Sequence, residues 1–102
     1  MLEIQTRISR KFGLIFRQTV LGAIYARFGK LSPEVARQNN EIISEANSRL
    51  YQFLASQGIA DPVRIFATIE LEDNGLIKKI KITKIEVYKK EKELLPNIEV
   101  GQ

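Results

Sequence analysis

The chain has 102 residues and a net charge of +4, and it contains neither cysteine nor histidine. A chain of this length forms one small domain around a single core. Because disulfides, thiol chemistry, the commonest general base and the commonest transition-metal ligand are all excluded, we expect a binding protein without a cofactor, not an enzyme.

The composition also bears on where the protein acts. No run of eighteen or more apolar residues is present, and the opening segment MLEIQTRISRKF lacks the apolar core of a signal peptide. The absence of cysteine fits a reducing compartment, so we expect a cytoplasmic protein without a membrane partner. Abundant isoleucine, lysine and glutamate without cysteine or tryptophan favour a thermophilic source.

The first predicted elements are a strand and a helix. Apolar and polar residues alternate from Leu2 to Ser9, which indicates a strand with one buried face. Ser9 is the expected N-cap of a helix from about Arg10 to Phe28, which Gly29 ends. Apolar residues cover most of the circumference of this helix. We therefore expect it to be buried on several sides, by a second chain or by the sheet and second helix together.

A second helix is predicted from about Pro33 to Gln57. Ser32 is the expected N-cap, Pro33 takes the first helical position and Glu34 lies in the first turn. Apolar residues then recur at three- and four-residue spacing. Asn39 lies on the same stripe, either as a polar residue reached by water near the turn or as a polar registration point in an interface.

Basic residues gather on the first helix, and no acidic residue lies between Ile4 and Pro33. They form a candidate secondary basic patch of Arg10, Lys11, Arg17, Arg27 and Lys30. The simpler interpretation is that these are the solvent-facing positions of an otherwise buried helix. Arg17 interrupts the apolar surface and needs a partner, for which Glu41 or Glu45 is the expected residue.

The segment from Val63 to Lys90 is predicted to form a long β-hairpin. Alternation from Val63 to Glu72 indicates a strand, and Asp73-Asn74-Gly75 is a strong turn signal because Asn and Gly tolerate positive φ. On the return strand the apolar residues change parity, which places a β-bulge near Thr83-Lys84. The inner face then holds Ile80, Ile82, Ile85 and Val87, and the outer face holds Ile77, Lys79, Lys81, Lys84, Glu86, Tyr88 and Lys90.

The outer face of this hairpin is the main candidate site. Its basic and aromatic members, together with Arg7 from the first strand, are Arg7, Arg64, Phe66, Lys79, Lys81, Lys84, Tyr88 and Lys90. Lysines and arginines contact phosphates and aromatic rings stack on bases, a combination typical of single-strand binders. The alternative is an exposed antiparallel sheet that its lysines keep soluble and protect from edge-to-edge pairing.

The whole chain is predicted to be α+β in the order β-α-α-β-β. A three-stranded antiparallel sheet carries an antiparallel helix pair on one face, within a single domain of residues 1–90. Residues 91–102 include Pro96, which forbids a continuing helix, and form either a mobile tail or an interface arm through Leu94, Leu95 and Ile98. The apolar first helix and the small size favour a homodimer or a higher homo-oligomer.

Four segments carry a resemblance to a known group. They are LEIQTRISR, the basic and apolar helix that follows it, NSRLYQFL, and DPVRIFATIELEDNGLIKKIKITKIEVYKK. Over roughly residues 2–90 the chain resembles a family of small uncharacterised archaeal proteins of thermophiles, related in design to the single-stranded DNA-binding proteins of the Thermoproteales. The resemblance implies nucleic-acid binding by a basic, aromatic-lined surface and assembly into dimers or larger units.

The leading hypothesis is a non-enzymatic protein that binds single-stranded DNA or RNA with low sequence specificity. The alternative is a structural or assembly module that docks a protein partner through its apolar helix or its sheet. The excess of apolar residues between Phe12 and Phe28 motivates this alternative.

Overall fold

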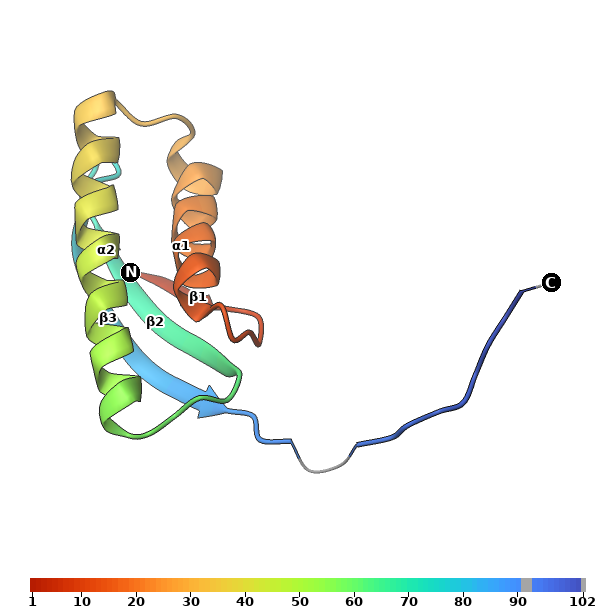
Figure 1. Ribbon diagram of the computed structural model, residues 1–102. Helices are drawn as coiled ribbons and strands as arrows, with labels where there is room; N and C mark the ends of the chain where they lie inside the picture. The colour runs from red at the N-terminus through yellow and green to blue at the C-terminus, as the bar shows by residue number, and fades with distance from the viewer. Residues whose placement is uncertain (91–92, 102) are drawn as a thin grey trace.

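The computed structural model describes residues 1–90 and 93–101. It contains β1 (Leu2–Gln5), α1 (Phe12–Phe28), α2 (Pro33–Ser56), β2 (Val63–Leu71) and β3 (Ile77–Val87). The strands form an antiparallel sheet in the order β1-β2-β3, and the two helices run antiparallel over one face of it (Figure 1). The predicted α+β fold and its element order are confirmed. Within the described residues, no helix is long and apolar enough to cross a membrane.

The core lies between the helix pair and the central strand β2. Alternate residues of β2 face inward and are buried, which is what the period-2 pattern predicted. The core is built from one apolar stripe of each helix and this face of the sheet: Phe16, Val20, Ile24, Ile43, Leu50, Leu54, Val63, Ile65, Ala67 and Ile69. Because β2 has a neighbour on both sides, the outer strands β1 and β3 supply the two open edges of the sheet.

The return strand β3 contains the predicted bulge. Phe66 lies opposite Lys84, whereas the next residue, Ala67, lies opposite Ile82. Thr83 is therefore an extra residue that has no partner on β2. Its insertion keeps the isoleucines on both sides of it facing the core, as the change of parity in the sequence predicted.

A second bulge lies near the hairpin turn and overturns one prediction. Glu70 lies opposite Lys79, but Leu71 lies opposite Ile77, so Lys78 is an extra residue. The Ile77 side chain consequently faces the core and is only 2% exposed. Its predicted place on the outer face was wrong because the parity of the strand changes twice, not once.

The hairpin turn depends on one glycine. Gly75 has φ 87°, and its N–H donates to the Glu72 carbonyl at 3.0 Å. Gly75 is the one residue of this turn with positive φ, and every described residue with positive φ is a glycine. The Asn74 side chain accepts a hydrogen bond from the Leu76 N–H at 3.0 Å, so its expected role at positive φ was wrong and it stabilises the loop through its amide.

Asn39 fastens this turn to α2. The fully buried Asn39 amide donates to the Gly75 carbonyl at 3.0 Å and accepts from the Ile77 N–H at 2.8 Å. It therefore satisfies two backbone groups of the hairpin that water does not reach. Asn39 was predicted either to be reached by water or to set the register of an interface. Both predictions were wrong, because Asn39 is fully buried and its partners are backbone groups of its own chain.

The start of α1 also differs from the prediction. β1 ends at Gln5, and Ser9 forms an isolated bridge to Val63 on β2. The Ser9 hydroxyl accepts a hydrogen bond from the Lys11 N–H at 2.9 Å, and the helix begins only at Phe12. Ser9 is thus held by the sheet and does not cap the helix.

The other predicted helix start is confirmed. The Ser32 hydroxyl accepts a hydrogen bond from the Val35 N–H at 3.3 Å, and Pro33 begins α2. The sheet and α2 together do not bury α1 on several sides, because its outward residues Leu14 and Tyr25 are exposed in the single chain. Burial of this surface by a second chain stays a prediction.

The C-terminal segment leaves the sheet. Residues 93–101 form no helix or strand and run away from the body of the protein (Figure 1). Residues 91, 92 and 102 of the predicted tail lie outside the described residues. Within 93–101 the apolar side chains Leu94, Leu95, Ile98 and Val100 are exposed to solvent.

Candidate nucleic-acid interface

The sheet face opposite the helices is the surface on which the predicted site lies. We call it the open sheet face. The strand register places ten outward side chains on it: Glu3, Gln5, Arg64, Phe66, Thr68, Glu70, Lys79, Lys81, Lys84 and Glu86. Tyr88 follows directly after β3 and its hydroxyl reaches back to Glu86.

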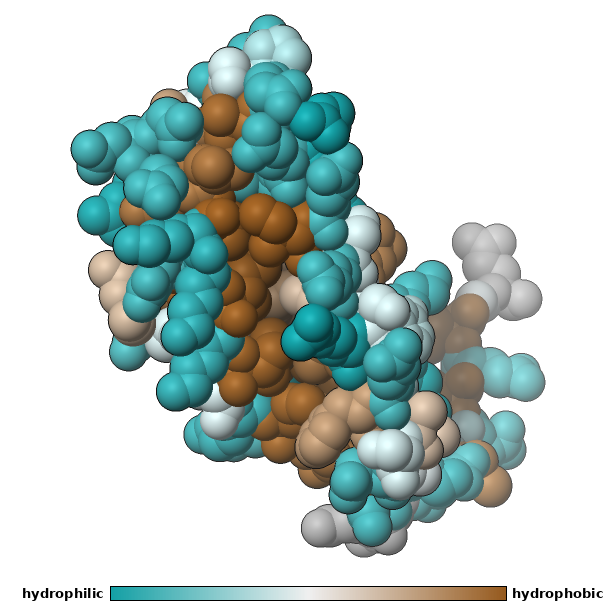
Figure 2. Space-filling model, turned by 90° about the vertical axis from the view of Figure 1, so that its left-hand side faces the viewer, coloured by the Kyte–Doolittle hydropathy of each residue, from teal (hydrophilic) through white to brown (hydrophobic). Residues whose placement is uncertain are grey.

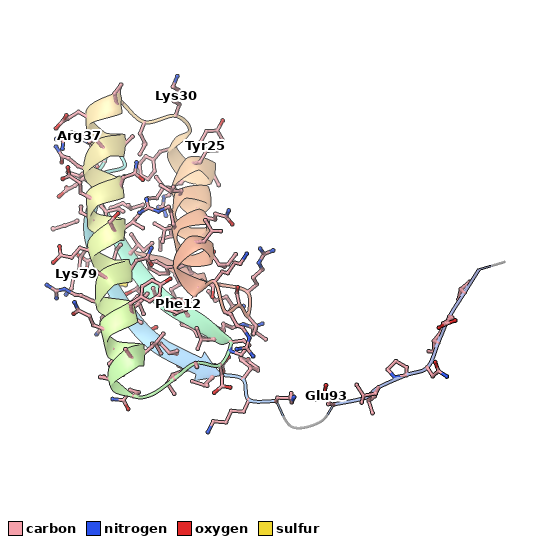
Figure 3. The ribbon with its side chains drawn as sticks, viewed as in Figure 1. Phe12, Tyr25, Lys30, Arg37, Lys79 and Glu93 are labelled. Atoms are coloured by element: carbon pink, nitrogen blue, oxygen red, sulfur yellow. The ribbon has the colours of Figure 1, made fainter. Side chains whose placement is uncertain are left out.

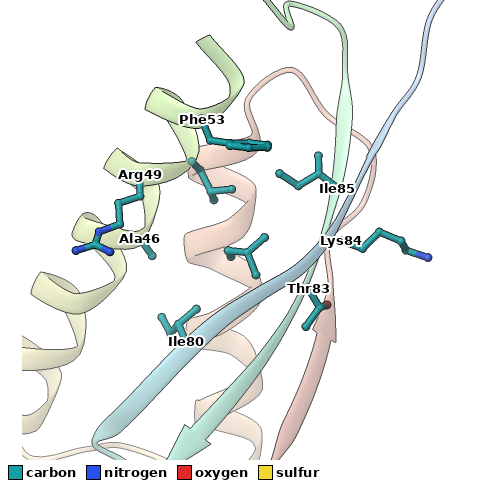
Figure 4. Close-up of a pocket in the computed structure, with 9 residues that line it drawn as sticks. Ala46, Arg49, Phe53, Ile80, Thr83, Lys84 and Ile85 are labelled. Atoms are coloured by element: carbon teal, nitrogen blue, oxygen red, sulfur yellow. The ribbon is translucent and has the colours of Figure 1, made fainter. Parts of the chain in front are cut away.

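Phe66 and Lys84 form one cross-strand pair in the middle of this face. The Lys84 ammonium lies 4.2 Å from the centroid of the half-buried Phe66 ring, a cation–π arrangement. The same ammonium lies 3.7 Å from the Glu86 carboxylate. The side chain of Lys84 points away from α2 (Figure 4). A nucleobase would stack on Phe66 only after Lys84 moved aside toward a phosphate.

Arg64, Glu86 and Tyr88 form a second group at the end of the hairpin. The Tyr88 hydroxyl donates a hydrogen bond to the Glu86 carboxylate at 2.9 Å, and the Arg64 guanidinium lies 6.0 Å from the centre of the Tyr88 ring. The hydrogen bond to Glu86 raises the pKa of Tyr88 above its ordinary value, while the charge of Arg64 acts in the opposite direction. Tyr88 is therefore held against the sheet, with part of its ring exposed.

Three carboxylates share this face, and the sequence analysis gave them no part in the candidate site. Glu70 lies opposite Lys79, and Glu86 lies opposite Arg64. Glu3 on β1 lies opposite Thr68 on β2, which in turn lies opposite Lys81 on β3. Cross-strand pairs of opposite charge stabilise a sheet. The positive charge of the face consequently does not cover it evenly. It is concentrated along β3, where Lys79, Lys81 and Lys84 occupy successive outward positions.

Two predicted site residues lie away from this group. Arg7 follows the end of β1 and lines a shallow hollow with Ile15, Gln18 and Thr19 of α1, toward the helix layer. Lys90 lies beyond β3, where its ammonium pairs with the Glu93 carboxylate at 2.9 Å. The structure thus brings together the predicted residues Arg64, Phe66, Lys79, Lys81, Lys84 and Tyr88.

The predicted partners of Arg17 are wrong. The Arg17 guanidinium donates to the Asn40 side-chain oxygen at 2.8 Å and to the Ser44 hydroxyl at 2.7 Å, both on α2. Glu41 and Glu45, the expected partners, pair with arginines of α2 itself. Arg17 therefore joins the two helices through neutral acceptors.

The secondary basic patch is spread along the whole length of α1 and the loops that flank it. Arg10 precedes the helix and donates to the Ala60 carbonyl at 3.0 Å. Lys30 lies at the opposite end, in the loop between the helices (Figure 3). Arg27 lies beside Leu2 and Asp73, near the hairpin turn. These basic residues do not gather into one site.

A groove between α2 and β3 is a feature that the sequence analysis missed. It has a volume of about 510 Å³ and is lined by Ala46, Arg49, Leu50, Phe53, Ile80, Ile82, Thr83, Lys84 and Ile85. On this side of the molecule a band of hydrophobic side chains runs between two hydrophilic borders (Figure 2). Phe53 and Ala46 approach the groove from α2, and Ile80 and Ile85 approach it from β3 (Figure 4). The isoleucines were expected to be covered by the helices, but they are only partly buried against the core.

Nothing in the described part of the chain suggests a metal centre, because residues 1–90 and 93–101 hold no group of three acidic side chains placed to bind an ion. In comparisons with known proteins, no family model, no curated protein and no solved structure matches this chain. Any proposal about its function therefore depends on the chemistry of its own surfaces.

Proposed function

We propose that the protein binds single-stranded nucleic acid, without catalysis and with little sequence specificity, through the β3 side of the open sheet face. The observation that carries this proposal is the contact between Lys84 and Phe66 on the uncovered side of the sheet. It supplies a cation and an aromatic ring at one position.

The spacing of the lysines supports a strand that runs along β3. Lys79 and Lys81 are two residues apart on the same face, which corresponds to about 7 Å along a β-strand. Lys84 continues the row beyond the bulge at Thr83. Ammonium groups in such a row contact successive phosphates without reading the bases, so the affinity falls as salt rises.

The aromatic residues supply the part of the binding energy that does not depend on charge. When a phosphate draws Lys84 away, the exposed side of Phe66 becomes available to a base. Stacking of this kind contributes roughly 1–3 kcal/mol per base and accepts any base. Tyr88 is held in place by Glu86 and lies at the end of the same row.

Titration of fluorescent oligonucleotides at several salt concentrations tests the proposal. The double variant Lys81→Glu/Lys84→Glu should lose most of its affinity, and the slope of log K against log salt should fall by about 1.4, since each phosphate contact to a single strand contributes about 0.7. Phe66→Leu should weaken binding and leave this slope unchanged, because it removes stacking and no charge.

The matched control is Lys11→Glu/Lys30→Glu, which changes the net charge equally at exposed positions near the two ends of α1. It should bind nearly as well as the unchanged protein. If the two double variants lose equal affinity, binding follows the net charge and the open sheet face is not the site. Undetectable binding of the unchanged protein at low salt would remove the proposal altogether.

A second candidate function is the docking of a protein segment, and the groove between α2 and β3 favours it. An edge strand with partly buried isoleucines offers both unpaired backbone groups and an apolar surface. This function occupies the helix side of β3, whereas nucleic acid would occupy its outward side.

A further inference from the structure

We propose that the groove binds the C-terminal arm of a second copy of this chain, and that two copies exchange their arms. The arm is residues 93–101. It would lie along the free edge of β3 as an added strand, with its apolar side chains in the groove. This inference names a partner for the docking role, and it stands whether or not the open sheet face binds nucleic acid.

The groove has the two features that bind an extended segment. One wall is the free edge of β3, where the backbone groups have no partner strand among residues 1–90 and 93–101. The floor and the other wall are apolar, from Ile80, Ile82 and Ile85 on the strand and Phe53 on α2. An added strand takes hydrogen bonds from the first feature and side-chain burial from the second.

The arm has the sequence of such a strand. Leu94, Ile98 and Val100 have the same parity, and Glu93 and Glu99 have the other. Ile98 is 76% exposed and Val100 is 98% exposed in the single chain, so these side chains lack a covering surface. In an added strand they would face the groove, and the two glutamates would lie on the side of the open sheet face.

Pro96 fixes which side of the arm can pair with β3. It has the parity of Leu94 and Ile98, and it lacks an N–H. Proline is tolerated in an edge strand where its nitrogen faces away from the sheet. The backbone groups of Leu95 and Asn97 would then pair with β3, and those of Pro96 would lie on the new outer edge.

The charges of the arm and of β3 are complementary. Residues 93–101 contain Glu93 and Glu99 and no basic residue. On the open sheet face, where these two glutamates would lie, β3 carries Lys81 and Lys84. An added strand would therefore bring its carboxylates beside these two lysines.

The lengths match as well. An arm of nine residues spans about 30 Å when extended, and the eleven residues of β3 span about 36 Å. The arm is therefore long enough to pass along the whole stretch from Ile80 to Ile85 that lines the groove, and it would cover most of the free edge.

The connection to the arm favours exchange between copies over folding back within one chain. Folding back on β3 requires a hairpin turn in Lys89-Lys90-Glu91-Lys92, which contains no glycine, proline, asparagine or aspartate. Residues 93–101 run away from the helices and the sheet of their own chain (Figure 1). A second copy placed around a two-fold axis would receive this arm and return its own.

Disulfide trapping tests the inference directly, because the chain has no cysteine of its own. One preparation carries Ile98→Cys in the arm, and a second carries Ala46→Cys or Phe53→Cys in the groove. Mild oxidation of the mixture should form a mixed disulfide for at least one groove position, and its mass, the sum of the two different variant masses, distinguishes it from the symmetrical dimers of either preparation. The control is Tyr25→Cys, an exposed aromatic position on α1, away from the groove, which should give at least tenfold less product.

Two outcomes would overturn the inference. One is a mixed product from the groove positions that does not exceed the Tyr25→Cys control. The other is found in a chain that carries both Ile98→Cys and Phe53→Cys: a disulfide within one chain, at the mass of a monomer, would show that the arm fills its own groove.

Light scattering is the second measurement. The unchanged protein should have the mass of a dimer, and Leu94→Ser/Ile98→Ser should have the mass of a monomer. A monomeric mass for the unchanged protein at high concentration would also contradict arm exchange.

Discussion

The two ends of the contact between α2 and β3 differ sharply. At the end near the hairpin turn, Asn39 binds the turn backbone and Ile77 is sealed against the core. Toward the other end, Phe53 and the isoleucines of β3 border an open groove. The same helix and strand therefore form a closed end, where Asn39 is hydrogen-bonded to the turn, and an open end, where an apolar groove separates them. The comparison suggests that the closed end determines stability and that the open end is left for a partner.

The largest expected effect comes from breaking the closed end at Asn39. Asn39→Leu leaves the Gly75 carbonyl and the Ile77 N–H buried without partners, at a cost of about 3 kcal/mol in the free energy of unfolding. For a domain of this size the melting temperature should fall by more than about 10 °C. Thermal unfolding followed by circular dichroism measures this change.

The neighbouring Asn40 provides the control. It is exposed, and its side chain binds Arg17 on the surface. Asn40→Leu should lower the free energy of unfolding by less than about 1 kcal/mol. Equal losses in the two variants would show that the hydrogen bonds of Asn39 to the turn do not hold the closed end.

A smaller loss is expected at Gly75. Its positive φ disfavours any side chain, and an added Cβ would lie 2.5 Å from a methyl group of Leu31. Gly75→Ala should therefore cost about 2 kcal/mol, of which about 1 kcal/mol is backbone strain. Gly58 also has positive φ, follows the end of α2 and is surrounded by open space, so Gly58→Ala should show the strain alone. Chemical denaturation separates the two, and a Gly58→Ala loss as large as that of Gly75→Ala would remove the steric part of this explanation.

The smallest effect on unfolding is expected at the open end. Phe53 is 53% exposed and contributes little to the core of a single chain. Phe53→Ser should change the free energy of unfolding of dilute protein by less than about 1 kcal/mol, while it weakens self-association about tenfold. Sedimentation at several concentrations measures the second quantity. Tyr25→Ser, at a similarly exposed aromatic of α1, should leave association unchanged, and a strong loss of folding stability in Phe53→Ser would place Phe53 in the core instead.

The sequence predicted the fold because its strongest signals are local. Ser32-Pro33 determines the start of α2, and the change of parity between Ile82 and Ile85 required a bulge. The second bulge carries the same kind of signal, since Ile77 and Ile80 also differ in parity. It was missed because the register was assumed to run unbroken from the turn.

The errors at other residues have a different physical origin. Asn39 bonds to backbone groups 36 and 38 residues away, and a backbone partner leaves no trace in the pattern of side chains. Arg7 was assigned by extending the alternation of β1 past Gln5, where the regular strand ends. The groove depends on how far α2 lies from the edge of β3, a distance that periodicity does not determine.

The central claim is that β3 presents a nucleic-acid surface on its outward side, and amide chemical shifts test it most directly. Labelled protein is titrated with a short single-stranded oligonucleotide. The amide signals of Phe66, Lys81 and Lys84 should shift and saturate together, and those of Lys11 and Lys30 should stay in place. Shifts confined to α1, or no shifts at low salt, would contradict the claim.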